Sequence, residues 1–455
     1  MLKDRINAFA KALSEYIAKS YDCEYEIYAC YGDSFDVKVI GGEIDNYSVN
    51  DFIGISLRVK HNGKTGYSST TVPDIDDIPR MVSRAIDNAE IIESGDMQFI
   101  YGGDKEYPHP KTFSEELYNV TSSEKIDLAR RLEKTALESD DMIVRTMGSY
   151  VCSSTSGKII KNSSGLDVSE QYGYIAAYVI PIAQKGDEMN SGFAYTAALD
   201  ASGLDIEKAG RQASEDAIRY CGISSCKAGR MKTVIDNMAL IDLFSAFADI
   251  FSSENAQRGL SLLAGKEGEK IASDCVNITD DPLQDGSFGA RGFDDEGVAS
   301  KTCRVVENGV LKTLLYNLKT AHKAGKDSTA SACKGSYSSP VSIGFSNFRL
   351  ESGEYTRQQL LQMADNGIII TSLEGLHAGA NSATGDFSLS AKGILIKDGK
   401  EDRAVTGLTV SGNIYELLKN IQCVGNDVRV NPFGMVASCP SVLLDKPMAI
   451  ASEGE

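Results

Sequence analysis

Apolar residues recur every three or four positions in the first stretch of the chain, which is the spacing of an amphipathic helix. This stretch covers residues 2–20, where polar residues separate the apolar positions. Over residues 22–72 the spacing changes to alternation, which predicts antiparallel strands. An Asn-Gly pair at residues 62–63 lies between two such segments and is typical of a tight hairpin. Residues 78–89 return to helical spacing, so the first unit is predicted to be helix, strands, helix.

A second stretch repeats this order of elements. Thr121 and Glu124 form a capping-box pattern that predicts the start of a helix. Strands are predicted at about residues 142–151, 157–162, 167–184 and 190–199, and a closing helix at about residues 204–221. We therefore expect a duplicated unit of helix, antiparallel sheet and helix, with a chance likeness between two common layouts as the alternative.

Weak sequence similarity between the two stretches supports the duplication. Gly66 and Gly192 each lie at a strand end and each precede an aromatic residue. The helix that follows carries an Ala-Ile pair in both stretches, Ala85-Ile86 in the first and Ala217-Ile218 in the second. We interpret these pairs as equivalent positions.

From about residue 230 the chain is rich in glycine and in short apolar segments. Segments 304–311 and 393–400 turn on Asn-Gly or Asp-Gly and predict hairpins. We expect a large, mainly β, barrel-like domain here. The predicted fold class is α+β, with one unit over residues 1–93, a linker over 94–120, a second unit over 121–225 and the β domain over 230–455.

Charge and composition exclude several classes of protein. The chain has 46 Lys and Arg against 64 Asp and Glu, a net charge of -18, which disfavours direct binding to nucleic acid. No run of 18 apolar residues is present, so we expect neither a membrane span nor secretion. The ten cysteines are scattered without metal or redox spacing, which favours reduced thiols and a cytoplasmic location.

Metal and nucleophile motifs are weak. The four histidines are too far apart to share one helix face, and the most apolar helix of the C-terminal half, predicted over residues 237–251, contains none. We interpret it as a packing helix rather than a zinc helix. His377, Asp386 and Ser388 could form a nucleophilic triad on paper, but no Gly-x-Ser-x-Gly elbow accompanies the serine.

The densest acidic cluster lies between residues 280 and 296. It consists of Asp280, Asp281, Asp294, Asp295 and Glu296, each close to glycine or proline. We interpret these residues as solvated turns; a site for a hard cation such as calcium is the alternative.

Long motifs in the C-terminal half resemble those of the TldD/PmbA family. They are GLHAGANSATGDFS at residues 375–388, VTGLTVSGN at 405–413, GKEGEKIAS at 265–273 and FDDEG at 293–297. Similar but shorter matches occur in the N-terminal half, at residues 162–165 and 66–69. The resemblance therefore extends over almost the whole chain.

This resemblance implies a role in proteolysis. In the family, a TldD branch carries zinc on a His-Glu-x-x-x-His helix, and a TldE/PmbA branch lacks it. The two branches pair as a protease that degrades or matures unfolded peptides. The positions corresponding to the first His, the Glu and the last His are Phe244, Ser245 and Asp249. The chain thus resembles the TldE/PmbA branch, and the resemblance implies no catalytic residue and no bound zinc in this chain.

The expected partners follow from the same resemblance. They are a zinc-bearing TldD-like paralogue in a heterodimer, or a second copy in a homodimer, together with an unfolded peptide. Cys439 lies near a cysteine used by the zinc branch, and we interpret it as a structural thiol. The candidate substrate-channel residues are His377, Gly379, Asn381, Thr384, Asp386 and Ser388.

Two other functions stay open. The chain could be a peptidase by itself with an unrecognised metal site, although it has few histidines. It could also be a binding protein that modulates another protein, such as gyrase, without proteolysis, which is how older descriptions of the second branch read.

Overall fold

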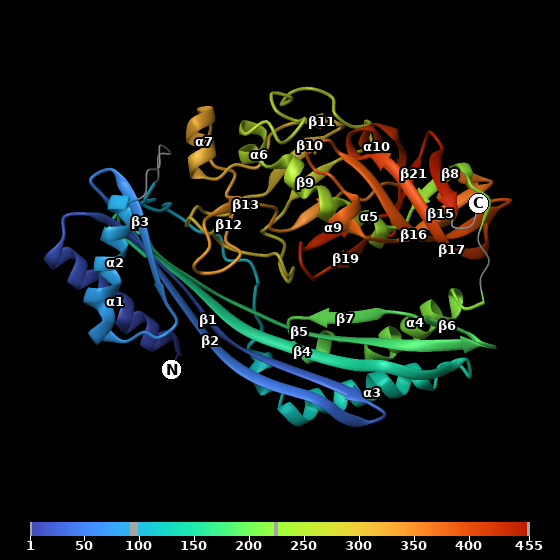
Figure 1. Ribbon diagram of the computed structural model, residues 1–455, viewed down its shortest axis with the longest axis horizontal. Coiled ribbons are helices and arrows are strands. Elements are labelled where there is room, and N and C mark those ends of the chain that lie inside the picture. Colours follow the sequence, from blue (N-terminus) through green and yellow to red (C-terminus); the bar gives the residue numbers. More distant parts are fainter. Residues whose placement is uncertain (1, 92–98, 223–225, 453–455) are drawn as a thin grey trace.

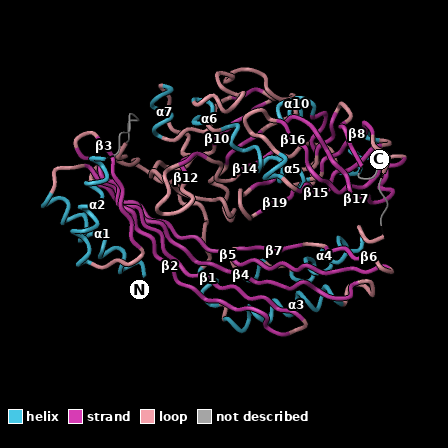
Figure 2. Tube along the Cα trace, viewed as in Figure 1, coloured by secondary structure: helices cyan, strands magenta, loops and turns pink. Residues whose placement is uncertain are grey.

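The computed structural model describes residues 2–91, 99–222 and 226–452. A long, curved sheet carries helices on one face, and the C-terminal domain lies over the other face (Figure 1). The four longest strands run beneath that domain for most of its length (Figure 2). None of the described helices is long and apolar enough to cross a membrane.

The N-terminal half forms one seven-stranded sheet. Its strand order is β3-β2-β1-β4-β5-β6, and β7 also pairs with β5. The strands are β1 (Glu24–Ile40), β2 (Glu43–His61), β3 (Lys64–Thr70), β4 (Ile143–Asn162), β5 (Asp167–Lys185), β6 (Glu188–Ser191) and β7 (Ala194–Ala198). The helices are α1 (Leu2–Ser20), α2 (Ile78–Ile91), α3 (Ser122–Leu137) and α4 (Ile206–Arg219).

Most sequence-based elements of this half are confirmed. The Asn62-Gly63 turn joins β2 to β3 with positive φ at both residues, as a tight hairpin requires. Thr121 and Glu124 form the predicted capping box of α3. The prediction of separate strands at 142–151 and 157–162 was wrong, because β4 continues through both and pairs with β1 and β5 along its length.

The two glycines of the repeat occupy equivalent positions in the structure. A Cβ on Gly66 would lie 2.0 Å from the Ala85 carbonyl oxygen, and one on Gly192 would lie 2.1 Å from the Ala213 carbonyl oxygen. Each glycine therefore touches the backbone of the helix that follows, in both units. The second contact of each glycine is Ala89 and Ala217 respectively, so the equivalent of Ala217 is Ala89. The predicted pairing with Ala85 was wrong by one helical turn.

The segment that joins the two units contacts both halves of the molecule, and its Tyr101 carbonyl accepts from the Asn162 side chain of β4. Residues 94–98 of the predicted linker lie outside the described residues. Farther along, the Tyr107 hydroxyl donates to the Gly297 carbonyl, and the Lys111 amide donates to the Asp285 carboxylate. The predicted unit boundaries stay a prediction, and the strands of both units join in one sheet.

The C-terminal domain is built from short strands and curled sheets, as expected. Strand β15 pairs with β16 on one edge and β8 on the other, which closes β15-β16-β17-β22-β8 into a ring. A six-stranded sheet, β11-β10-β9-β14-β20-β19, lies beside it. The predicted hairpins are β10–β11 and β16–β17. The α+β fold class with a barrel-like C-terminal domain is therefore confirmed.

The bounds of the C-terminal elements are as follows. The strands are β8 (Gly229–Ile235), β9 (Ile278–Asp280), β10 (Cys303–Glu307), β11 (Val310–Leu311), β12 (Ala332–Cys333), β13 (Ser342–Ile343), β14 (Phe348–Leu350), β15 (Gly367–Glu374), β16 (Asp386–Lys397), β17 (Lys400–Asn413), β18 (Ile421–Val424), β19 (Arg429–Asn431), β20 (Ala437–Cys439), β21 (Val442–Leu444) and β22 (Met448–Ser452). The helices are α5 (Asn237–Phe247), α6 (Ser253–Gln257), α7 (Leu318–Ala324), α8 (Arg357–Ala364), α9 (Leu376–Gly379) and α10 (Ile414–Asn420).

Candidate functional site

The predicted substrate-channel loop is a tightly hydrogen-bonded turn, and the His377 side chain has no hydrogen-bond partner among the described residues. The Asp386 carboxylate accepts from the Asn413 side chain at 2.8 Å, and the Ser388 hydroxyl accepts from Ser411. A Cβ on Gly379 would lie 2.3 Å from the Ser388 carbonyl oxygen, so this glycine is needed for close packing. His377 is exposed on α9, which packs beside α5 (Figure 1).

The other two predicted residues hold this turn. The Asn381 side-chain oxygen accepts from the amide of Thr384, and the Thr384 hydroxyl accepts from the amide of Asp386. The role of the loop in a substrate channel stays a prediction, in which His377 is the side chain left available to a ligand.

The positions that match the zinc helix do not fit a metal. Phe244 is 1% exposed and packs against Phe348, with ring centroids 4.9 Å apart. The Ser245 hydroxyl donates to the Ile241 carbonyl, and Asp249 lies in a 3₁₀ turn beyond the end of α5. Within residues 2–91, 99–222 and 226–452, no three His, Cys, Asp or Glu side chains gather closely enough to hold a metal ion. A phenyl ring cannot replace an imidazole ligand.

Cys439 is also unsuited to metal binding. Its side chain is fully buried in β20, and burial raises the pKa of the thiol well above its usual value. A thiol that stays protonated is a poor ligand, because metals bind the thiolate.

The interpretation of the acidic cluster as solvated turns was wrong. Asp280 is 2% exposed and Asp294 is fully buried. Backbone amides replace water around them: the amides of Ser346 and Asn347 donate to Asp280, and the amides of Glu296, Val298 and Ala332 donate to Asp294. The cluster organises the loop between β9 and β10, which faces the long sheet.

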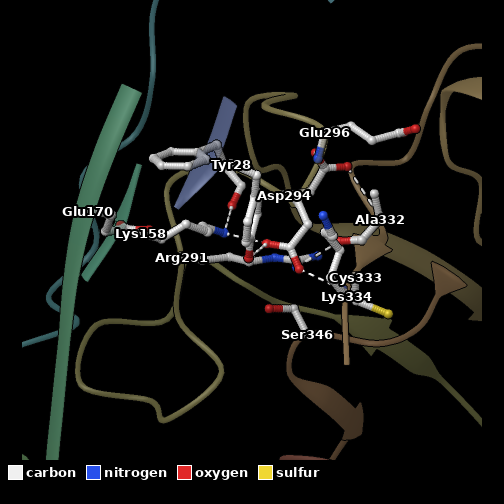
Figure 3. A network of polar contacts seen from close by, with 12 residues as sticks. Tyr28, Lys158, Glu170, Arg291, Asp294, Glu296, Ala332, Cys333, Lys334 and Ser346 are labelled. Atoms are coloured by element: carbon white, nitrogen blue, oxygen red, sulfur yellow. Dashed lines mark hydrogen bonds and ion pairs between the residues drawn. The ribbon is translucent and has the colours of Figure 1, made fainter. Parts of the chain in front are cut away.

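A buried ion pair joins this loop to the sheet (Figure 3). Lys158 on β4 donates to the Asp295 carboxylate at 2.8 Å, and Tyr28 on β1 donates to the same oxygen at 3.2 Å. The other Asp295 oxygen accepts from the Lys334 amide at 2.7 Å. Burial by itself would raise the pKa of Asp295, but the Lys158 and Arg291 charges outweigh it and hold the pKa below its usual range.

A second sheet-to-loop contact lies beside the ion pair. Glu170 on β5 accepts from the Gly292 amide at 2.8 Å and from the Tyr172 hydroxyl at 2.6 Å. Three adjacent strands of the sheet, β1, β4 and β5, therefore each supply one side chain to the same loop. The loop is fixed against the sheet by polar groups that are buried or half-buried.

Two buried carboxyl groups in the loop have raised pKa values. Burial, followed by the nearby Asp294 charge, raises the pKa of Glu296 to about 8, although the Leu318 amide donates to its carboxylate at 2.8 Å. Burial raises the pKa of Asp294 to about 6, and Arg291 opposes that shift. Glu296 is therefore largely protonated at neutral pH.

Two adjoining cavities lie between the sheet and the C-terminal domain. The larger is about 400 Å³, and Lys158, Arg291 and Asp295 are among its lining residues. The smaller is about 270 Å³ and continues from it, because both are lined by Tyr172, Phe288, Ala290 and Gly434. The volume of the larger cavity is in the usual range for a ligand-binding pocket.

Aromatic side chains continue along the same gap. Tyr150 and Tyr178 stack on neighbouring strands with ring centroids 4.5 Å apart, and Phe193 follows at 5.8 Å from Tyr178. Tyr195 then reaches Phe433 of the C-terminal domain at 5.3 Å. These rings offer an extended apolar surface on which a flexible chain can pack.

Sequence reasoning missed the basic members of this site. Lys158 is 137 residues away from Asp295 in the chain, and nothing in its local sequence distinguishes it from other strand lysines. The one usable signal was the Phe293–Gly297 motif, in which three acidic residues in succession lie between an aromatic residue and a glycine. Neither cavity is lined by the predicted loop residues from His377 to Ser388.

The chain is similar to known proteins along most of its length. Residues 25–89 match domain 1 of PmbA/TldA metallopeptidases, residues 115–220 their central domain and residues 228–451 their C-terminal domain. A protein named Metalloprotease from Methanothermobacter thermautotrophicus is 30% identical over 83% of this chain and 82% of its own length. Metalloprotease PmbA of Escherichia coli O157:H7 is 26% identical over 98% of this chain and 96% of its own.

A solved structure has the same fold. It is the crystal structure of a protein from Thermotoga maritima MSB8 described as a modulator of a DNA gyrase. The TM-score is 0.90 at 32% sequence identity, and the likeness covers 98% of this chain and all of the other.

Proposed function

Because the chain belongs to the TldD/PmbA metallopeptidase family, we propose that it is the subunit without catalytic zinc in a two-subunit peptidase that degrades or matures unfolded peptides. The observation that carries this proposal is the side chain at the first ligand position. Phe244 is a fully packed core residue there. Its phenyl ring offers no donor atom to a metal, and exchanging it for a ligand side chain would leave a cavity in the core. Zinc and the hydrolytic step then belong to a TldD-like partner.

The gap between the sheet and the C-terminal domain supports a role in holding peptide. Its cavities and aromatic rings lie along the inner face of β4 and β5. An unfolded peptide has apolar side chains to bury and backbone groups to satisfy, and both kinds of contact are available in this gap.

An open sheet edge supports a partner that differs from this chain. Among the described residues, no strand pairs with the outer edge of β2 over residues 43–54, where Ile44, Tyr47 and Val49 are all more than two-fifths exposed. A long apolar edge favours pairing with another chain. The same stretch carries three acidic residues and no basic one, so antiparallel pairing with a second copy would place like charges together. A heterodimer is therefore favoured over a homodimer.

Mixing the purified chain with its zinc-bearing paralogue tests the proposal. We expect cleavage of an unfolded peptide to rise at least about tenfold over the paralogue alone, and the chain alone to show none, because each subunit lacks part of the site. Peptide release is followed by mass spectrometry, with zinc content measured on each chain after dialysis. Unchanged cleavage on mixing would contradict the proposal, and stoichiometric zinc in this chain would favour a peptidase that acts alone.

His377→Ala tests the predicted substrate loop within that complex. We expect an unfolding temperature close to that of the parent, because the side chain is exposed and makes no hydrogen bond among the described residues. We expect turnover of long peptides to fall more than turnover of short ones, since remote contacts help to align the scissile bond. His322→Ala is the matched control, since His322 is an exposed histidine on α7. A large loss of stability, or equal effects on long and short peptides, would show that the loop is only structural.

A further inference from the structure

Arg291 is a buried cation without a direct anionic partner. It is 9% exposed, and its guanidinium donates to two neutral carbonyl oxygens, those of Ala332 at 3.1 Å and Ala330 at 2.8 Å. Among the described residues it forms no ion pair, and its Nε–H has no acceptor. A guanidinium has five N–H donors, so most of its hydrogen-bonding capacity is unused.

The carboxylates around Arg291 are already satisfied by other groups. Backbone amides hold Asp280 and Asp294, and Lys158, Tyr28 and the Lys334 amide hold Asp295. These three carboxylates stabilise the buried guanidinium only by longer-range Coulomb attraction, without a direct hydrogen bond. A charged group that is buried without a close partner is costly, so its presence beside a cavity points to an anion that binds there.

The larger cavity has the walls that such a ligand needs. Arg291 and Lys158 line it together, and Asp295, whose oxygens already accept from Lys158, Tyr28 and the Lys334 amide, is the acidic side chain among its lining residues. Figure 3 shows Arg291 between Lys158 and the segment that contains Ala332. Five aromatic side chains also line the cavity, those of Tyr28, Phe52, Tyr172, Phe288 and Phe345.

We propose that this cavity binds a peptide carboxylate that is attached to an apolar residue, with the carboxylate next to Arg291 and Lys158 and the apolar side chain against the aromatic wall. A carboxylate brings a single negative charge to the unused N–H donors of Arg291, whereas a phosphate would bring a second charge close to Asp280, Asp294 and Asp295. The adjoining 270 Å³ cavity offers room for the neighbouring residue of the peptide. The inference rests on the proposed function, because it names the kind of peptide end or side chain that this subunit would hold.

The carboxylate has two possible sources, the C-terminus of a peptide or an acidic side chain. Binding to the isolated full-length chain is measured by calorimetry with three probes that separate them. The first is N-acetyl-Ala-Ala-Phe as the free acid, the second is the same peptide as its C-terminal amide, and the third is N-acetyl-Ala-Glu-Phe amide. We expect at least one carboxylate-bearing probe to bind ten times more tightly than the uncharged amide. Equal binding of all three would overturn the inference.

Variants locate the binding to this cavity. Arg291→Met should weaken binding of the preferred carboxylate probe at least tenfold and leave the uncharged amide unaffected. Since Arg291 also holds two backbone carbonyls, Ser156→Leu offers a second variant that fills the cavity from β4 and keeps every contact of Arg291. Arg349→Met is the matched control, because this arginine pairs with Asp281 and does not line the cavity. Unchanged binding in folded Ser156→Leu would overturn the assignment.

These measurements separate the inference from the proposed function. They use this chain alone, while the proposed function is tested by cleavage after mixing with the zinc-bearing chain. If cleavage rises on mixing but the chain alone shows no preference for a carboxylate probe, only the carboxylate-binding inference is contradicted. A carboxylate preference without any effect of mixing removes the two-subunit proposal and leaves the binding site.

Discussion

Asp295→Asn is expected to destabilise the protein by about 3–5 kcal/mol, since it leaves the Lys158 ammonium buried without its counter-charge. The Lys158 side chain is 9% exposed, so water cannot replace the carboxylate. The variant keeps the shape of the side chain, but it removes the charge and replaces one of two acceptor oxygens by an N–H donor. Urea unfolding of the full chain at neutral pH measures the effect.

A second ion pair on the same strand provides a matched control. Lys161 pairs with Asp167 at 3.1 Å, but the Asp167 side chain is 65% exposed. Asp167→Asn should cost no more than about 1 kcal/mol, because water solvates the lysine that remains. Equal losses in the two variants would show that the sheet-to-loop ion pair contributes no more than a surface contact. The double variant Lys158→Met/Asp295→Leu should recover much of the stability, since no Lys158 ammonium is then left buried without its counter-charge.

The sequence was a good guide to local structure because local chemistry decides it. The Asn62-Gly63 turn, the Thr121 capping box and the hairpin between β16 and β17 each depend on a few adjacent residues. The strand β4 was divided wrongly because Ser153 and Ser154 are polar and small, although pairing on both edges keeps that stretch extended. Pairing partners, rather than local residues, decided its length.

The site shows the opposite case. The acidic loop residues have the composition of a solvated turn, and only the folded chain brings Lys158 and Tyr28 to them from distant segments. Phe244 shows what comparison with a sequence motif can predict. The motif placed a phenylalanine where the family has its first zinc ligand, and the structure adds that this side chain is packed in the core. Motifs predicted the family, whereas the cavity and its charges required three-dimensional proximity.

Glu296→Gln is expected to change how stability depends on pH. The pKa of Glu296 is about 8 in the folded protein against an ordinary value of 4.5, so the folded state holds this proton more tightly than the unfolded state. Its contribution to stability is therefore complete below pH 4.5 and is lost progressively as the pH rises through 8. Glutamine stays neutral throughout, so the variant should gain stability relative to the parent by a few kcal/mol across this window, at about 1.4 kcal/mol per pKa unit.

The measurement is the free energy of unfolding of both proteins at several pH values between 5 and 9. Asp294 titrates in the same direction with a pKa of about 6, so the variant should keep a weaker pH dependence in the lower part of this range. Glu416→Gln is the control, because that side chain is 71% exposed on α10 and pairs with Lys419 at the surface. Parallel curves for the parent and Glu296→Gln would show that the buried carboxyl is ionised at neutral pH. A difference that grows as the pH rises toward 8 would show instead that Glu296 keeps its proton in the folded protein, and that this buried carboxyl becomes a cost to stability under alkaline conditions.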